Sequence, residues 1–254
     1  KNKKKHIYFQ SFFLALAVYT RQYYALIFFY FLFIYYQNFN FKIFLKICFF
    51  IFLLSLPGFF LIYHEPILLT TTLDNKLNLS NIILVSSSIL SFYLLPFYFF
   101  KTLKDKGRNI FNKQFYFVLI LSIILTLIFF NFFNYDYRYG GGFFLKLSYL
   151  ILNNPYFFLL TSTSGFVILM LLIKEYKINT FLIIIMLVGF PAYMIYQKYY
   201  EPMFIFILFL LIKTKLTENF FTSRKYLILY YFYILLYLSS ALINDYLNLT
   251  KTVL

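Results

Sequence analysis

The chain has 254 residues, of which 63% are hydrophobic and 26% aromatic, while only 12% are charged. A soluble domain carries about a quarter charged residues, so this composition excludes an ordinary soluble domain. The net charge of +15 does not indicate nucleic-acid binding, because the basic residues form short clusters between apolar runs and no long basic stretch. Cys48 is the single cysteine and His6 and His64 lie far apart, so we expect no disulfide framework, metal site or other cofactor.

The apolar runs predict an all-α transmembrane bundle that forms a single domain over residues 1–254. A helix of roughly 20 residues crosses the ~30 Å hydrocarbon layer, and backbone in lipid must satisfy its own hydrogen bonds. Nothing alternates as in the strands of a membrane barrel. Nine spans are predicted in chain order: 7–20, 22–36, 42–63, 79–100, 114–133, 155–173, 179–196, 202–213 and 225–243. The first and eighth are short, so we expect them to be tilted or re-entrant.

The basic residues predict the orientation of these spans in the membrane. One set of loops, beginning with the N-terminal tail, holds 17 of the Lys and Arg residues, and the alternate set holds 6. Because positive charge favours the cytoplasmic side, we expect the N-terminus inside and the C-terminus outside. The predicted location is a bacterial inner membrane or an ER-like membrane, with the lipid bilayer as the first partner.

Arg21 and Gln22 interrupt an apolar stretch that otherwise runs from Ile7 to Tyr36. That stretch is too long for one ordinary crossing, so we predict two short helices joined by an outer turn. A guanidinium near lipid is costly without a partner, and its geometry suits two-point binding of phosphate. An arginine that reaches the interface and pairs with lipid phosphate explains the same position.

The third predicted outer loop, 135–142, combines Arg138 with tyrosines and glycines. The guanidinium and the backbone amides would hold an anion, and Asp136 would be an ion-pair partner. Such a loop is also typical of an aromatic belt at the membrane interface. Five of the eight acidic residues are on the predicted outer side, which would form a binding surface for a charged, hydroxyl-rich ligand.

The fourth predicted outer loop contains Lys198, Tyr200 and Glu201 just before Pro202. In a functional interpretation, these three side chains face a sugar or its phosphate. In a structural interpretation, the proline begins a helix and the carboxylate favours the positive helix N-terminus. Both interpretations stay open.

The segments Thr20-Arg21-Gln22-Tyr23-Tyr24 and Tyr199-Tyr200-Glu201-Pro202 resemble the C-terminal part of GT-C superfamily glycosyltransferases. These multispan enzymes use polyprenyl-phosphate sugars, and the likeness is closest to the dolichol-pathway alpha-1,2-glucosyltransferases and their bacterial relatives. That group has Arg-Gln after a short span and Glu-Pro beside Arg-Tyr before a late span. Here Met203-Phe204 stands in place of Arg-Tyr.

The resemblance implies inverting transfer of a sugar from a lipid-phosphate-linked donor to an acceptor on the non-cytoplasmic face. Arg21 would offset charge on the departing phosphate, and Gln22 and Tyr24 would bind sugar or phosphate oxygens. Glu201 and Lys198 would line the other side of the pocket. The superfamily's catalytic acid lies near the N-terminus. Because this chain begins with Lys1 and not Met, we expect a fragment that lacks the acid, and the catalytic residues stay unassigned.

Two other functions stay open. A transporter or flippase for a lipid-linked or anionic substrate would have discontinuous helices, charges within spans and a repeated half. Phe, Tyr, Ile, Leu, Asn and Lys dominate the sequence, and their codons are rich in A and T. A structural subunit of an organellar membrane complex would explain this bias and require nothing of Arg21 or Glu201. An enzyme needs the outer polar residues to meet in one cavity, a transporter needs a route through the midplane, and a structural subunit needs neither.

Overall fold

The described part of the chain is built of helices. The computed structural model describes residues 2–20, 24–65, 78–104, 113–189, 194–214 and 223–253, and these ranges contain no strand. The predicted all-α class is therefore confirmed. Arg21 and Gln22, two of the predicted site residues, lie outside the described residues.

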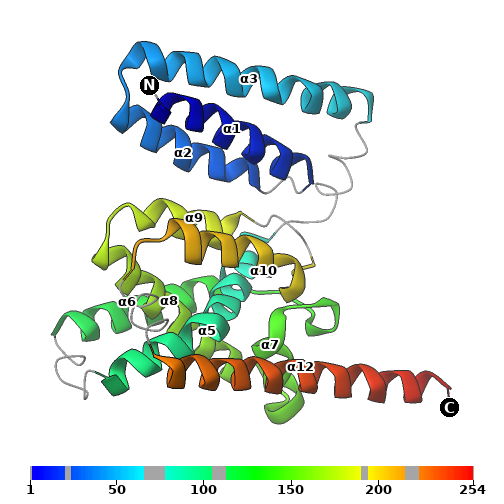
Figure 1. Cartoon of the computed structure of the whole chain (residues 1–254). Coiled ribbons are helices and arrows are strands. Elements are labelled where there is room, and N and C mark those ends of the chain that lie inside the picture. Colours follow the sequence, from blue (N-terminus) through cyan, green and yellow to red (C-terminus); the bar gives the residue numbers. More distant parts are fainter. Residues whose placement is uncertain are drawn as a thin grey trace.

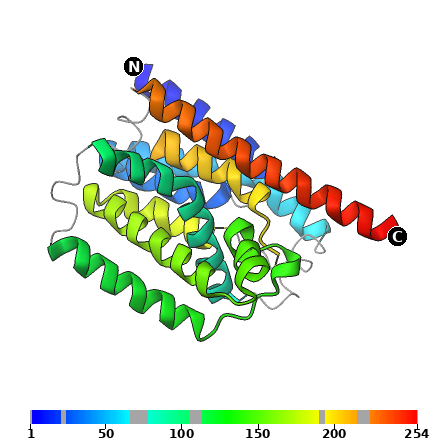
Figure 2. The same cartoon turned by 90° about the horizontal axis from the view of Figure 1, so that it is seen from below.

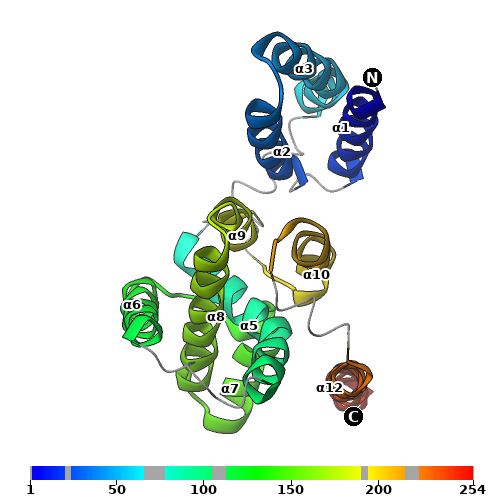
Figure 3. The same ribbon diagram turned by 60° about the vertical axis from the view of Figure 1, so that its left-hand side comes forward.

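Helices α1 (Asn2–Thr20), α2 (Ala25–Asn38) and α3 (Phe41–His64) form a group of three at the top of Figure 1, which Figure 3 shows nearly end on. Pro57 lies inside α3, where it removes one backbone donor from the helix. Beside it, the Tyr19 hydroxyl of α1 donates to the Leu54 carbonyl at 2.5 Å and accepts from the Gly58 amide at 3.1 Å. One side chain of α1 thus joins two backbone groups of α3.

Helices α5 (Leu79–Lys104), α6 (Lys113–Phe130), α7 (Gly142–Leu152) and α8 (Tyr156–Glu175) form a second group. Small side chains bring α5 and α8 together: the Ser87 hydroxyl donates to the Ser162 carbonyl and the Ser162 hydroxyl donates to the Leu84 carbonyl, each at 3.1 Å. Ser88 and Thr161 share a hydrogen bond of 3.1 Å. In lipid, small residues of this kind let two helices approach closely.

Helices α9 (Asn179–Val188) and α10 (Gln197–Phe206) lie between these two groups, and the π-helix η3 (Ile207–Leu211) continues α10. Helix α12 (Arg224–Val253) lies along one side of the bundle, and its C-terminal end extends past the other helices (Figures 1 and 2). The Tyr233 hydroxyl of α12 donates to the Phe92 carbonyl at 3.0 Å, and Tyr226 stacks on Phe100 with ring centroids 5.0 Å apart.

Four helices among the described residues are long and apolar enough to cross a membrane: α3, the Leu79–Phe100 part of α5, α6 and α8. The other apolar helices are shorter; α2, α7 and α9 have 14, 11 and 10 residues. At 1.5 Å per residue these lengths are roughly 21, 16 and 15 Å, less than the hydrocarbon layer. Several helices thus suit a membrane, while the nine crossings stay a prediction.

Two local differences from the predicted spans concern the site. Helix α7 lies where only an outer loop was expected, and within the predicted span 179–196 helix α9 ends at Val188 and the described residues 194–196 are not helical. The next helix begins at Gln197, five residues before the predicted start at 202. Glu201 therefore lies inside helix α10 and not in a loop before it.

Candidate functional site

Glu201, near the start of α10, forms the centre of a buried polar contact. Its carboxylate oxygen Oε1 accepts a hydrogen bond from the hydroxyl of Tyr93 on α5. Tyr93 is 14 residues from Leu79 and 11 from Lys104, so it stands near the middle of α5. The half-buried carboxylate of Glu201 therefore lies beside the middle of a membrane-length helix.

Gln197, one turn before Glu201, joins the same contact. Its amide nitrogen donates to the Tyr93 hydroxyl at 2.8 Å, and its amide oxygen accepts from the backbone N–H of Phe143 at 3.0 Å. Phe143 is the second residue of α7. Three helices, α5, α7 and α10, thus meet through the side chains of Tyr93, Gln197 and Glu201.

Three consecutive glycines shape the approach to α7. Gly140, Gly141 and Gly142 have φ values of 125°, 81° and 78°, which glycine adopts without the steric cost that other residues incur. A Cβ on Gly142 would lie 2.8 Å from Ile89 Cγ1 on α5. The glycines therefore allow the backbone to turn directly against α5 and to present the Phe143 amide to Gln197.

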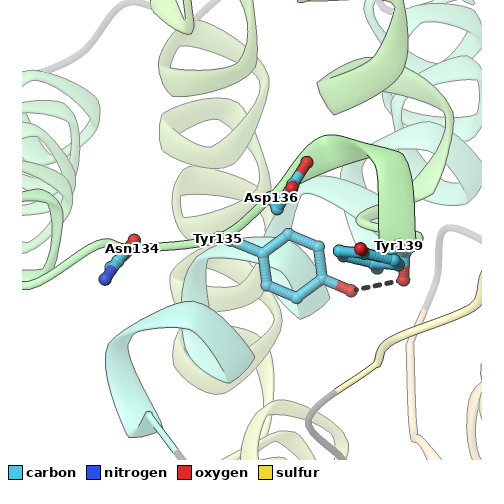
Figure 4. A pocket seen from close by; sticks show the side chains of 4 residues that line it. All are labelled: Asn134, Tyr135, Asp136 and Tyr139. Carbon is cyan, nitrogen blue, oxygen red and sulfur yellow. Dashed lines mark hydrogen bonds between the residues drawn. The ribbon is translucent and has the colours of Figure 1, made fainter.

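The 135–142 loop is bonded to the segment before α10. The Gly141 amide donates to the Ile195 carbonyl at 2.9 Å, and the Ile195 amide donates to the Tyr135 hydroxyl at 2.8 Å. The same hydroxyl donates to the Tyr139 carbonyl at 3.2 Å (Figure 4). The 135–142 loop therefore lies directly against the segment that leads into α10.

A small pocket lies in this loop, lined by Asn134, Tyr135, Asp136 and Tyr139 (Figure 4). Its volume of about 10 Å³ is close to the room that one water molecule needs. It is therefore too small for a sugar, and the residues around Glu201 form the stronger candidate site.

Arg138 and Asp136 form the predicted ion pair, with 2.6 Å between Nη2 and Oδ2. Hydrogen bonds from the Arg138 side chain and from its backbone amide lower the pKa of Asp136, and the carboxylate raises the pKa of Arg138. The Arg138 side chain is 71% exposed, and its charge is already paired with Asp136. A substrate phosphate would compete with Asp136 for it.

The other predicted site residues occupy different surroundings. Tyr24 is half-buried and packs edge to face on Phe206, with ring centroids 6.3 Å apart. Lys198 is exposed, with Nζ 5.9 Å from the centre of the Tyr196 ring. Tyr200 is fully buried, and its hydroxyl donates to the Met186 carbonyl on α9. Their contacts with a substrate stay predictions, and the geometry gives Tyr200 a role in packing.

Aromatic rings from α5, α10 and α12 surround the carboxylate of Glu201. The Tyr93 ring packs on Phe204 with centroids 5.0 Å apart, and the carboxylate interacts electrostatically with Tyr230 and Tyr237 of α12. The sequence analysis named Glu201 but neither Tyr93 nor these two tyrosines. One carboxylate within several tyrosine side chains is a setting that suits a hydroxyl-rich ligand.

Comparisons with protein-family models, with curated proteins and with solved structures give no match to the chain.

Proposed function

We propose that the chain is part of a membrane glycosyltransferase, which transfers a sugar from a polyprenyl-phosphate-linked donor to an acceptor on the non-cytoplasmic face. One observation supports this most directly. Tyr24 directly follows the segment 21–23, and it packs on Phe206, five residues after Glu201. The neighbourhoods of the Arg-Gln and Glu-Pro motifs, far apart in the sequence, therefore meet.

The lengths of the helices at this meeting point suit a lipid-linked donor. Helices α2, α9 and α10 have 14, 10 and 10 residues, too few to cross the hydrocarbon layer alone. Their ends therefore bring polar groups below the usual membrane boundary. A donor with its polyprenyl chain in lipid would present its phosphate and sugar at this level.

The roles within the proposed site follow from the chemistry of the side chains. Arg21 would bind the donor phosphate through two hydrogen bonds, and Gln22 and Tyr24 would bind nearby oxygens. Glu201 would accept a hydrogen bond from a sugar hydroxyl, within the aromatic rings of α5 and α12. The acid that activates the acceptor is not assigned to any residue of this chain.

Donor binding is the direct test, because it does not require the unassigned catalytic acid. The chain is reconstituted in nanodiscs and incubated with radiolabelled polyprenyl phosphate glucose or mannose, and the retained label is measured. We expect saturable retention by the wild type and at least a tenfold weaker affinity for Arg21→Lys, because a lysine cannot bind phosphate bidentately.

Arg138→Lys is the matched control, since Arg138 is exposed and already paired with Asp136. It should retain the donor about as well as the wild type. Absence of saturable binding to the wild type would contradict the proposal, and full binding by Arg21→Lys would leave Arg21 only an interfacial role.

A transporter is the second candidate, and the interruption after Glu201 favours it. Pro202 lies inside α10, and the π-helical segment η3 follows, so this helix is irregular next to a deep carboxylate. Irregular helices and carboxylates at mid-depth are typical of transporter sites. Uptake of radiolabelled sugar phosphate into proteoliposomes would favour transport, whereas donor retention without uptake favours the enzyme.

A further inference from the structure

Three hydrogen bonds that end at Glu201 form a series with one direction. The backbone N–H of Phe143 can only donate, so the amide oxygen of Gln197 must face it. The amide nitrogen of Gln197 then faces Tyr93, and an NH₂ group also only donates. The Tyr93 hydroxyl accepts that bond, and its own proton points to Glu201 Oε1.

The series begins at the N-terminus of α7. The Phe143 amide is among the first N–H groups of that helix, which have no partner within the helix and carry a positive partial charge. Hydrogen bonds in series polarise one another in the same sense. The interaction of α7 with Gln197 is therefore transmitted through Tyr93 to the carboxylate, which is held through one of its two oxygens.

We propose that Tyr93 and Gln197 are positioning residues: they hold Glu201 through Oε1 so that Oε2 accepts a hydrogen bond from a hydroxyl of the donor sugar. This inference rests on the proposed glycosyltransferase function. Among the described residues, no hydrogen bond reaches Oε2, whereas Oε1 is occupied by Tyr93. Glu201 is half-buried and not sealed, so a ligand can reach its second oxygen.

The groups around the carboxylate are consistent with Oε1 bonded to Tyr93 and Oε2 open to a ligand. Tyr230 and Tyr237 of α12 lie near it, and no cation among the described residues forms an ion pair with it. Lys198, on α10 itself, is exposed and lies near Tyr196. A carboxylate at this depth is costly to retain without a function, and a sugar hydroxyl is a donor that would satisfy Oε2.

The experiment measures the carboxylate and the ligand separately, in the full chain reconstituted in nanodiscs. Isotope-edited infrared spectra with ¹³C-glutamate report the Glu201 carboxyl band, which is assigned by its loss in Glu201→Gln. Tyr93→Phe should shift that band, and Gln197→Met should shift it in the same direction by less. Tyr233→Phe is the matched control, because its hydroxyl bonds the Phe92 carbonyl and not Glu201.

The same four variants are then tested for binding of radiolabelled polyprenyl phosphate glucose. We expect Tyr93→Phe and Gln197→Met to weaken affinity by about tenfold, the size of one lost hydrogen bond to a charged group, with Tyr233→Phe unchanged. Gln197→Asn tests whether a conservative change restores binding. Asparagine keeps the amide but is shorter, so the donor affinity of this variant should fall between those of the wild type and Gln197→Met.

The outcomes separate the two proposals. An infrared band that Tyr93→Phe does not shift overturns the hydrogen-bond series, whatever the donor does. A shifted band with unchanged donor affinity overturns the positioning role alone. Band shifts in the variants together with a wild type that binds no donor contradict the glycosyltransferase proposal and the sugar contact at Oε2, while the series itself stands.

Discussion

Gly165 on α8 lies directly against the backbone of Ser87 on α5. A Cβ atom added at Gly165 would be 2.1 Å from the Ser87 carbonyl oxygen and 2.8 Å from its carbon. Backbone atoms of a packed helix cannot move aside as the end of a flexible side chain can. This contact therefore determines how closely α5 and α8 approach, and α5 carries Tyr93 to Glu201.

The first prediction follows from that contact. Gly165→Ala should lower the free energy of unfolding by roughly 1–3 kcal/mol, because the added methyl forces the two helices apart. Unfolding is measured by titration with a denaturing detergent from mixed micelles. Gly58→Ala is the control, since its Cβ would first meet the Tyr19 ring at 3.3 Å. This variant should lower the free energy of unfolding clearly less than Gly165→Ala does. Equal stability of Gly165→Ala and the wild type would contradict the close helix contact.

The second prediction concerns Asn179, which is fully buried where α8, α9 and the end of η3 meet. Its amide nitrogen donates to the Leu172 carbonyl at 3.0 Å and to the Lys213 carbonyl at 2.8 Å, and its oxygen accepts from the Lys213 amide at 3.1 Å. Asn179→Ala removes all three hydrogen bonds and takes this partner from the Lys213 amide and carbonyl, while the Leu172 carbonyl still accepts from the Tyr176 amide at 3.3 Å, so we expect a loss of about 1–3 kcal/mol of unfolding free energy.

Asn38→Ala serves as the control for Asn179→Ala. The Asn38 side chain is exposed and bonds the Ile34 carbonyl within the end of its own helix. Its removal should change stability by no more than about 0.5 kcal/mol, as is usual at exposed positions. A loss at Asn179 no larger than at Asn38 would show that the connection between α9 and η3 does not depend on this side chain.

The helical class could be predicted from the sequence because backbone in lipid has almost no alternative to the helix. The residues at which helices end inside the bundle could not be predicted in this way. The segment just before α10 is held by contacts such as that of Gly141 with Ile195, which local hydropathy does not report. For the same reason α7, whose start depends on glycines packed against Ile89, lies in a segment that reads as a polar, aromatic loop.

The candidate site was predictable only in part. A carboxylate beside an apolar run is conspicuous, so Glu201 could be found. Tyr93 could not, because it is one of 27 tyrosines and its partner is 108 residues away. The runs 86–88 and 161–164, consecutive Ser and Thr within apolar spans, do carry a readable signal of close helix packing, which averaged hydropathy hides.

The third prediction uses the pair of Asp136 and Arg138. The hydrogen bonds from Arg138 lower the pKa of Asp136, so their stabilising effect is present above the ordinary aspartate value and is lost as the pH falls through the lowered pKa. Arg138→Gln should therefore raise the pKa of Asp136 toward its ordinary value. Carboxyl ¹³C chemical shifts measure this directly, because the chain has only four aspartates: Asp74, Asp105, Asp136 and Asp245.

Arg224→Gln is the control for the titration, since it removes one charge at the start of α12 and leaves the 135–142 loop unchanged. The titration of Asp136 should then match that of the wild type. A pKa of Asp136 that is the same in Arg138→Gln and in the wild type would show that the ion pair does not form in solution, and would leave the guanidinium available to an anion.

The fourth prediction tests the orientation on which the proposed outer site depends. In a Cys48→Ala background, single cysteines are introduced by Lys113→Cys, at the start of α6, and by Tyr139→Cys, in the 135–142 loop that follows α6. Both positions are exposed, and α6 has 18 residues, or about 27 Å, enough to separate them across most of the hydrocarbon layer. We expect an impermeant thiol reagent to label the Tyr139→Cys variant from outside, and the Lys113→Cys variant only after the membrane is opened.

Labelling of both variants from one side would show that α6 does not cross the membrane. Labelling of the Lys113→Cys variant alone from outside would show that the bundle has the opposite orientation. In the inverted case the Glu201 site would open to the cytoplasm, where the transport and structural alternatives would fit better than transfer on the outer face.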